Sequence, residues 1–220
     1  MYDSKAKIIP KVIKKGFIYN NTEVLKINLK YINVYLKNEL ASRKINMYFN
    51  NYINNLYNYI STSTLDDAVS GYKFATANNY PFFPYEVDVD YKITMNSNYI
   101  LSMYFDKYEF TGGAHGNTIR FGTTWDLKNG NLLTLSEIFP NVNNLNEQLI
   151  SQMILQANYN IKKNPGIYFN NYKDLIKTNF NEANFYLTPN SVNIFYQQYD
   201  IAPYSTGIVV FSIPFNALKV

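Results

Sequence analysis

The sequence predicts an α+β fold in which helices pack on an antiparallel sheet. Two apolar periodicities follow one another along the chain: alternation at every second residue, typical of strands, and three- or four-residue steps, typical of helices. They occur in blocks, several strands and then several helices, which favours α+β over a regular alternation of strand and helix. The chain has 220 residues, of which 47% are hydrophobic, so it can bury a core as one domain or as two small ones.

The chain begins with two expected strands and a helix. Residues 6–17 and 23–35 read as strands, and the pair Asn20-Asn21 between them favours a turn. From Ser42 to Ile60, apolar residues recur at helical spacing with asparagine and lysine between them. We therefore expect two strands around a turn, followed by an amphipathic helix.

Two further signals end this region. Thr64, with Asp67 three residues later, predicts the N-cap of a second, short helix. The Asn- and Pro-rich residues 78–84 predict a loop. We place a domain boundary there, between a small strand-helix subdomain (residues 1–78) and a larger domain of meander and helices (residues 79–220).

The larger domain is expected to begin with an antiparallel meander over residues 85–135. Residues 85–95 show the clearest strand alternation in the chain, and Asn129-Gly130 is a strong turn signal. Apolar positions before Asp106 are odd-numbered and those after Lys107 are even-numbered, which predicts a bulge at these two residues.

The C-terminal part is predicted to add helices and three strands. The expected elements are a helical turn at 136–139, a longer helix from Leu145 that stops at Pro165-Gly166, a short helix around 172–176, and strands at 185–187 and 192–196. Residues 208–215 are apolar on both faces except at Ser212, so we expect them to form a central strand.

A loop with three glycines connects two strands of the meander. Gly112, Gly113 and Gly116 suit a tight reversal, because glycine accepts positive φ. His115, the only histidine in the chain, lies among them. One interpretation is a recognition or catalytic loop that presents His115; the other, which turn chemistry favours, is a hairpin connection whose small residues satisfy backbone geometry. A phosphate-binding loop is excluded, because no Gly-Lys-Ser/Thr ending and no helix pattern follow.

Composition excludes several classes of site. Without cysteine, the chain cannot form disulfides, thiolate nucleophiles or Cys-ligated zinc and iron–sulfur sites. With one histidine, a metal site would depend on carboxylates, and we expect no metal and no cofactor. The net charge of +4 is spread out, so nucleic acid is not an expected partner. We see no signal peptide or membrane span, and the targeting segment of an exported protein would lie upstream.

Two features of the meander each have a structural and a functional interpretation. Glu86, Asp88 and Asp90 share one strand face and could receive a basic protein partner, but an ordinary solvated face explains them better. Trp125 lies on the apolar side of its strand, so we expect it in the core rather than in a sugar-stacking platform.

Three stretches carry the motifs of one family. They are residues 101–116, with Thr-Gly-Gly-Ala-His-Gly, residues 125–139, and residues 185–207, with Tyr-Asp-Ile-Ala-Pro-Tyr. These stretches resemble the domain of unknown function at the extracytoplasmic end of the sigma-V anti-sigma factor of Gram-positive bacteria. The same domain accompanies peptidoglycan deacetylases of the PdaC type. Residues 1–78 resemble the smaller, PdaC-type domain that often precedes it.

The resemblance implies an extracytoplasmic or cell-surface location and a non-enzymatic role in binding or sensing. In the anti-sigma factor the domain binds lysozyme, and in the deacetylases it is an accessory to a separate catalytic domain. Deacetylation is excluded here, because the metal set of those enzymes needs an aspartate and two histidines. Lysozyme and peptidoglycan are the expected partners, and the positive net charge of this chain would oppose the approach of a basic lysozyme.

The expected contact surface consists of two loops with polar and aromatic side chains, the usual makings of a binding surface. The candidate ligand-binding residues are Gly112, Gly113, His115, Tyr199, Pro203 and Tyr204. A rival hypothesis is a hydrolase in which His115 acts as general base with Asp106 or Glu109. A third is a structural domain in which the motifs only secure the fold.

Overall fold

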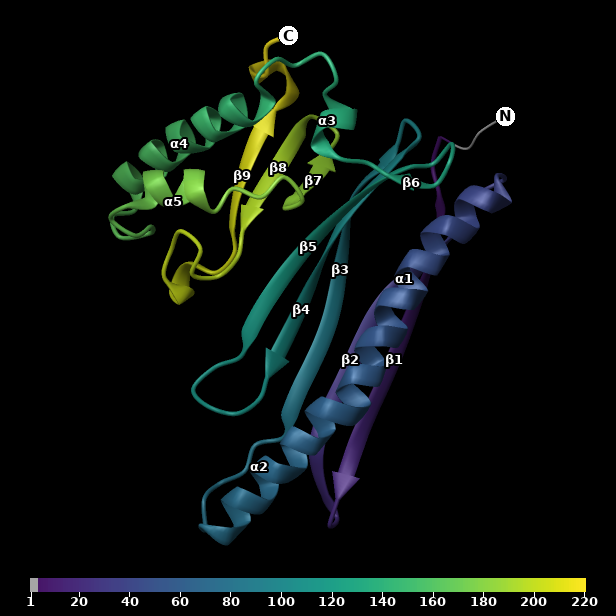
Figure 1. Cartoon of the computed structure of the whole chain (residues 1–220), viewed down its shortest axis with the longest axis vertical. Helices are drawn as coiled ribbons and strands as arrows, with labels where there is room; N and C mark the ends of the chain where they lie inside the picture. The colour runs from purple at the N-terminus through teal and green to yellow at the C-terminus, as the bar shows by residue number, and fades with distance from the viewer. Residues whose placement is uncertain (1–3) are drawn as a thin grey trace.

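The computed structural model describes residues 4–220, which form two β-sheets flanked by helices (Figure 1). The larger sheet has the strand order β1-β2-β3-β4-β5-β6 and the smaller one the order β7-β8-β9. The strands are β1 (Lys7–Tyr19), β2 (Thr22–Tyr35), β3 (Tyr85–Ser97), β4 (Ile100–Phe110), β5 (Asn117–Asp126), β6 (Asn131–Leu132), β7 (Phe185–Thr188), β8 (Ser191–Tyr196) and β9 (Val209–Pro214). The helices are α1 (Glu39–Tyr59), α2 (Leu65–Ala77), α3 (Leu135–Ile138), α4 (Leu145–Lys163) and α5 (Tyr172–Thr178). The predicted α+β class is confirmed.

Helices α1 and α2 belong to one long helical segment. Asn38 begins it, because its side chain accepts hydrogen bonds from two backbone N–H groups of the first turn. The predicted N-cap at Thr64 is wrong: a π-helical turn, Ile60–Thr64, joins the two helices, and Thr64 has helical backbone angles without a capping bond. The helix continues through this point because Ile60 and Ala68 both belong to the buried core.

The long helical segment allows β2 and β3 to pair in parallel. They run side by side from Leu25 opposite Tyr85 to Leu29 opposite Val89. Parallel neighbours need a crossover of a dozen or more residues, and the helices supply it. The pairs of the expected meander, β3 with β4 and β4 with β5, are antiparallel. Strands on both sides of residue 78 thus share one sheet, and the division into domains at that residue stays a prediction.

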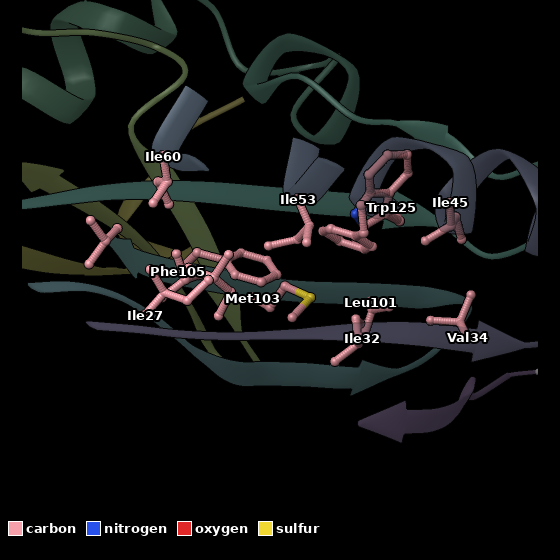
Figure 2. Packing of buried hydrophobic residues seen from close by; sticks show 14 of the residues in the cluster. Ile27, Ile32, Val34, Ile45, Ile53, Ile60, Leu101, Met103, Phe105 and Trp125 are labelled. Carbon is pink, nitrogen blue, oxygen red and sulfur yellow. The ribbon is translucent and has the colours of Figure 1, made fainter. Parts of the chain in front are cut away.

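One core lies between α1 and the larger sheet (Figure 2). Phe49 of α1 packs against Phe105 and Trp125, with ring centroids 5.3 and 5.8 Å away. Trp125 is 3% exposed, which confirms its interpretation as a core residue. A second core joins α4 and α5 to the smaller sheet. Each sheet therefore has helices of its own on one face (Figure 1).

The smaller sheet packs on the face of the larger sheet that points away from α1. The backbone N–H of Leu187 donates to the Ser102 hydroxyl on that face, at 2.8 Å. The two sheets approach each other closely at Gly122 of β5, where a Cβ atom would overlap the carbonyl oxygen of Phe185. Only glycine fits at this crossing. The close approach sets the position of the loop that follows β8 relative to the hairpin between β4 and β5.

The predicted bulge at Asp106 and Lys107 is wrong. Strand β4 pairs in regular register with both neighbours through these residues, and the irregularity lies between Ile93 and Met95 of β3. The apolar residues change from odd to even positions without a bulge, because an ion pair occupies the α1 side of β4 here. The Lys107 ammonium lies 2.9 Å from the Glu109 carboxylate.

The prediction that residues 208–215 form a central strand is also wrong. Strand β9 is an edge of the smaller sheet, and β8 is its centre. Val209, Phe211 and Ile213 are buried, whereas Ser212 and Pro214 are exposed. The strand therefore has one core face, and its partly buried outer Val210 made both faces look apolar in the sequence.

Candidate functional site

The loop between β4 and β5 is shaped by its glycines. Gly112 and Gly113 have φ values of 92° and 89°, which a side chain would strain. Gly116 is needed for a different reason: a Cβ atom there would overlap the ring of Tyr108. The reversal leaves His115 exposed at the end of the loop.

A second loop, after β8, packs against the glycine loop. The Tyr204 hydroxyl donates a hydrogen bond of 2.9 Å to the carbonyl of Gly116. The Tyr204 ring stacks on the His115 imidazole, with centroids 3.8 Å apart and planes 20° apart. The Tyr199 ring follows, 5.8 Å from that of Tyr204. The structure thus brings His115, Tyr204 and Tyr199 together in one row of rings.

The hydrogen bond of the His115 ring indicates its tautomer. Its Nδ1 atom lies 3.1 Å from the carbonyl oxygen of Gly116. Because a carbonyl can only accept, Nδ1 carries the proton, and in the neutral ring Nε2 has a free lone pair. The loop therefore presents an exposed hydrogen-bond acceptor on an ordered ring.

The remaining predicted residues shape the second loop. Tyr199 has a φ of 67°, a left-handed conformation that is uncommon for a bulky residue, and its side chain is 53% exposed. Pro203 precedes a short 3-10 turn, Tyr204–Thr206, and Gly207 ends it with a φ of 73°. Their roles in ligand binding stay predictions.

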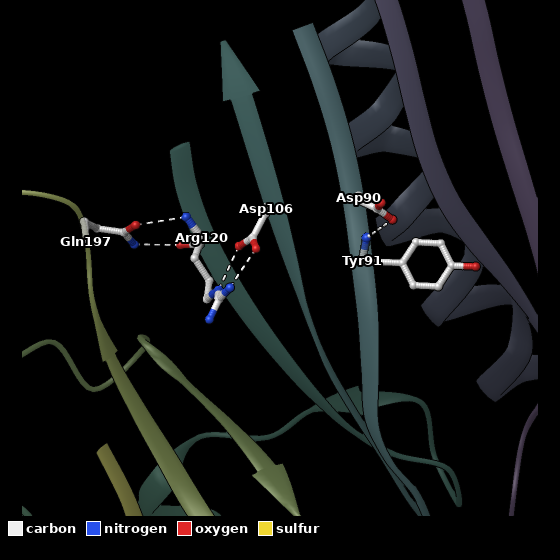
Figure 3. A network of polar contacts seen from close by, with 5 residues as sticks. All are labelled: Asp90, Tyr91, Asp106, Arg120 and Gln197. Atoms are coloured by element: carbon white, nitrogen blue, oxygen red, sulfur yellow. Dashed lines mark hydrogen bonds and ion pairs between the residues drawn. The ribbon is translucent and has the colours of Figure 1, made fainter. Parts of the chain in front are cut away.

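Two glutamines that the sequence did not single out hold the second loop on the edge of β5, and Figure 3 shows the first of them, Gln197. Gln197 accepts the backbone N–H of Arg120 at 2.9 Å and donates to its carbonyl at 2.7 Å. Gln198 accepts the backbone N–H of Thr118 at 2.7 Å. The side chains therefore take the place of a neighbouring strand. Glutamine in a loop has no periodic signature, so only the open edge of β5 could have indicated this role.

Arg120 and Asp106 form an ion pair beneath this loop (Figure 3). Two guanidinium nitrogens of Arg120 donate to the two carboxylate oxygens of Asp106, both at 2.7 Å, and the guanidinium lies 3.8 Å from the ring centroid of Tyr104. Burial disfavours the charged form of Arg120 and would lower its pKa. The hydrogen bonds to Asp106 and the charge of that carboxylate outweigh burial, so the pKa of Arg120 is raised. The pair braces β4 against β5 next to the second loop.

The residues of the hydrolase hypothesis each have a different partner. Asp106 binds Arg120, Glu109 binds Lys107, and His115 donates to a backbone carbonyl. Within residues 4–220, His115 makes no ion pair with a carboxylate, and no cluster of three or more His, Cys, Asp or Glu could hold a metal. No helix in the same residues has the length and hydropathy to cross a membrane.

The acidic row on β3 is largely neutralised by β2. The Lys26 ammonium lies 3.7 Å from the Glu86 carboxylate, and that of Lys30 lies 2.8 Å from Asp90. A row paired in this way resembles a solvated face more than a receptor for a basic protein.

Comparison with known proteins adds the family. Residues 18–118 match the family described as "Deacetylase PdaC", and residues 136–216 match the family described as "Protein of unknown function (DUF3298)". A curated relative, the peptidoglycan-N-acetylmuramic acid deacetylase PdaC of Bacillus subtilis (strain 168), is 29% identical over 82 residues. That match covers 37% of this chain and 17% of the deacetylase.

Two solved structures share the fold. A DUF3298-family member from Bacteroides fragilis has a TM-score of 0.71 at 15% identity, with 99% of this chain and 95% of the other covered. A DUF3298-family protein from Pseudomonas aeruginosa has a TM-score of 0.62 at 16% identity, with 99% and 97% covered. The resemblance in the motifs is confirmed: the chain belongs to the shared DUF3298/PdaC-like family.

Proposed function

We propose that this chain is a non-enzymatic module that binds or senses a component of the bacterial cell envelope outside the cytoplasm. The curated relative is by its name a deacetylase of peptidoglycan, and the match takes up 17% of its length, as an accessory domain would. Peptidoglycan and lysozyme, the enzyme that attacks it, are the two ligands that this context favours.

The observation that carries the proposal is the docking of the second loop on the glycine loop. The Tyr204 hydroxyl holds the Gly116 carbonyl, and two glutamines hold the same loop on β5. This framework leaves an imidazole and the Tyr199 ring exposed at fixed positions. Binding residues on loops that a rigid scaffold positions are the common design of recognition surfaces.

A binding role also agrees with the positions of His115, Asp106 and Glu109, each of which has a different partner. A hydrolase that used His115 as general base would need a carboxylate that orients the imidazole, or a reacting water near both the imidazole and a carboxylate. Here the two neighbouring carboxylates are neutralised by Arg120 and Lys107. The geometry therefore favours contact over proton transfer.

The test is a pull-down of the purified chain with insoluble peptidoglycan and, separately, with immobilised lysozyme. We expect the wild type to be retained by at least one of them, and His115→Ala and Tyr199→Ala to be released, because both side chains are exposed and their loss should leave the fold intact. Tyr35→Ala is the control, since Tyr35 is 61% exposed at the end of β2 and outside both loops. The proposal would be rejected if the two loop variants were retained as well as the wild type. It would also be rejected if neither ligand retained the wild type.

A further inference from the structure

Three loops follow one another along one side of the molecule (Figure 1): residues 197–207, 111–117 and 78–84, here called the three-loop surface. His115 of the glycine loop stacks on Tyr204 of the first. On the other side, a methyl group placed at Gly112 would lie 3.9 Å from the ring of Tyr85. The Tyr85 ring in turn stacks on Phe82 of the third loop, with centroids 6.4 Å apart. A ring contact therefore joins the first loop to the glycine loop, and the third loop lies beside the glycine loop at Tyr85.

The three-loop surface is almost free of charge. It contains no lysine or arginine, and Asp200 is its single carboxylate, although 16% of the whole chain is charged. Asp200 is already engaged, because its Oδ2 atom accepts the backbone N–H of Gln197 at 2.7 Å. The polar groups that remain are amides, hydroxyls and the His115 imidazole.

Exposed aromatic rings lie at both ends of this surface. Tyr199 is 53% exposed at one end, and Tyr80 and Phe83 are 60% and 62% exposed at the other. Tyr199 also keeps a left-handed backbone, with a φ of 67°. A strained conformation that presents a ring to solvent is an observation from which a binding role can be inferred.

We infer that the three-loop surface binds an extended, neutral glycan strand that carries hydroxyl and acetamido groups. The inference rests on the proposed function and deepens it by choosing a glycan over a protein. Aromatic rings offer faces to the C–H groups of sugars, and the free Nε2 of His115 accepts a hydroxyl or amide N–H. A basic protein such as lysozyme would require complementary carboxylates, and the surface has one.

The experiment measures the affinity of the chain for N-acetylglucosamine oligomers by calorimetry. A hexasaccharide should bind at least about tenfold more tightly than a disaccharide, because it reaches more than one loop. Tyr199→Ala should weaken both ligands by about three- to tenfold, the usual worth of one aromatic contact. Phe83→Ala should weaken only the hexasaccharide, and the exposed control Tyr35→Ala should change neither.

The possible outcomes separate this inference from the proposed function. Affinities that do not depend on chain length, or that Tyr199→Ala and Phe83→Ala leave unchanged, would overturn the inference. Binding of lysozyme but not of glycan, lost in His115→Ala, would also overturn it while supporting the proposed function. No binding of either ligand by the wild type would overturn both.

Discussion

The hydroxyl of Tyr204 donates to the carbonyl of Gly116, 88 residues earlier in the chain, across 2.9 Å. The two residues belong to regions that pack around different cores, one under α1 and the other under α4 and α5. This contact, with the stacking of Tyr204 on His115, makes one surface of two loops. The candidate site therefore depends on how the two sheets are held together.

Removing the Tyr204 hydroxyl should loosen this junction. In Tyr204→Phe the ring can still stack on His115, but the Gly116 carbonyl loses its hydrogen bond. We expect a loss of about 1 kcal/mol in the free energy of unfolding, the usual net worth of such a bond. Urea denaturation measures it. Tyr159→Phe is the matched control, because Tyr159 is 58% exposed on α4; an equal loss in both variants would contradict the account.

Adding a methyl group at Gly122 should separate the two sheets. In Gly122→Ala the new Cβ overlaps the Phe185 carbonyl, which belongs to backbone and cannot move alone. We expect a loss of about 3 kcal/mol in the free energy of unfolding, at the upper end for overpacking. Gly113→Ala, with φ of 89° but open space around it, should lose about 1 kcal/mol. A milder effect at Gly122 than at Gly113 would show that the sheets do not depend on this approach.

Neutralising Asp106 should cost more than neutralising an exposed acid. The side chain of Arg120 is 12% exposed and that of Asp106 is 30% exposed. Asp106→Asn therefore leaves a mostly buried guanidinium with one oxygen acceptor and no negative charge beside it. We expect a loss of about 2 kcal/mol in the free energy of unfolding, below the value for a fully buried pair. Asp90→Asn is the control, since Asp90 is 63% exposed in its pair with Lys30. Thermal unfolding of both variants decides, and equal effects would be against the structure.

Asp200 should make stability fall as pH rises through the acidic range. Burial raises its pKa above the ordinary 3.8, and the hydrogen bond from Gln197 only partly opposes the shift. A carboxyl with a raised folded-state pKa contributes stability that is complete below its unfolded pKa and lost as pH rises through the folded pKa. Asp200→Asn removes this contribution, so the variant should gain stability relative to the wild type from pH 4 upward. Denaturation of both proteins over this range is the measurement, and parallel curves would be inconsistent with a partly buried carboxyl whose pKa is raised.

Local signals in the sequence predicted most of the elements. Residues 85–95 alternate so regularly that their strand could be assigned with one face in the core, and Asn20 and Asn21 both have positive φ in the expected turn. Thr64 and Asp67 matched a capping box, but such a box acts only where a helix starts. Here the preceding helix continued because its next turn also faced the core, which a local motif does not reveal.

Contacts between distant parts of the chain could not be predicted in this way. The parallel pairing of β2 with β3 and the overlap at Gly122 each join residues far apart in sequence. The motifs that carry the family resemblance indicated His115 and Tyr204 separately, and only the structure places their rings 3.8 Å apart. The role of Gln197 could not be predicted, because it depends on the open edge of β5 that its side chain covers.

The most direct test of the contact surface is hydrogen exchange of the backbone amides with and without solubilised peptidoglycan fragments or lysozyme. Bound ligand should slow exchange in residues 111–117 and 197–207 and leave the lysine-rich strand β1 unchanged. Protection confined to β1 or to the outer face of α4, with both loops exchanging as in the free protein, would contradict the central claim.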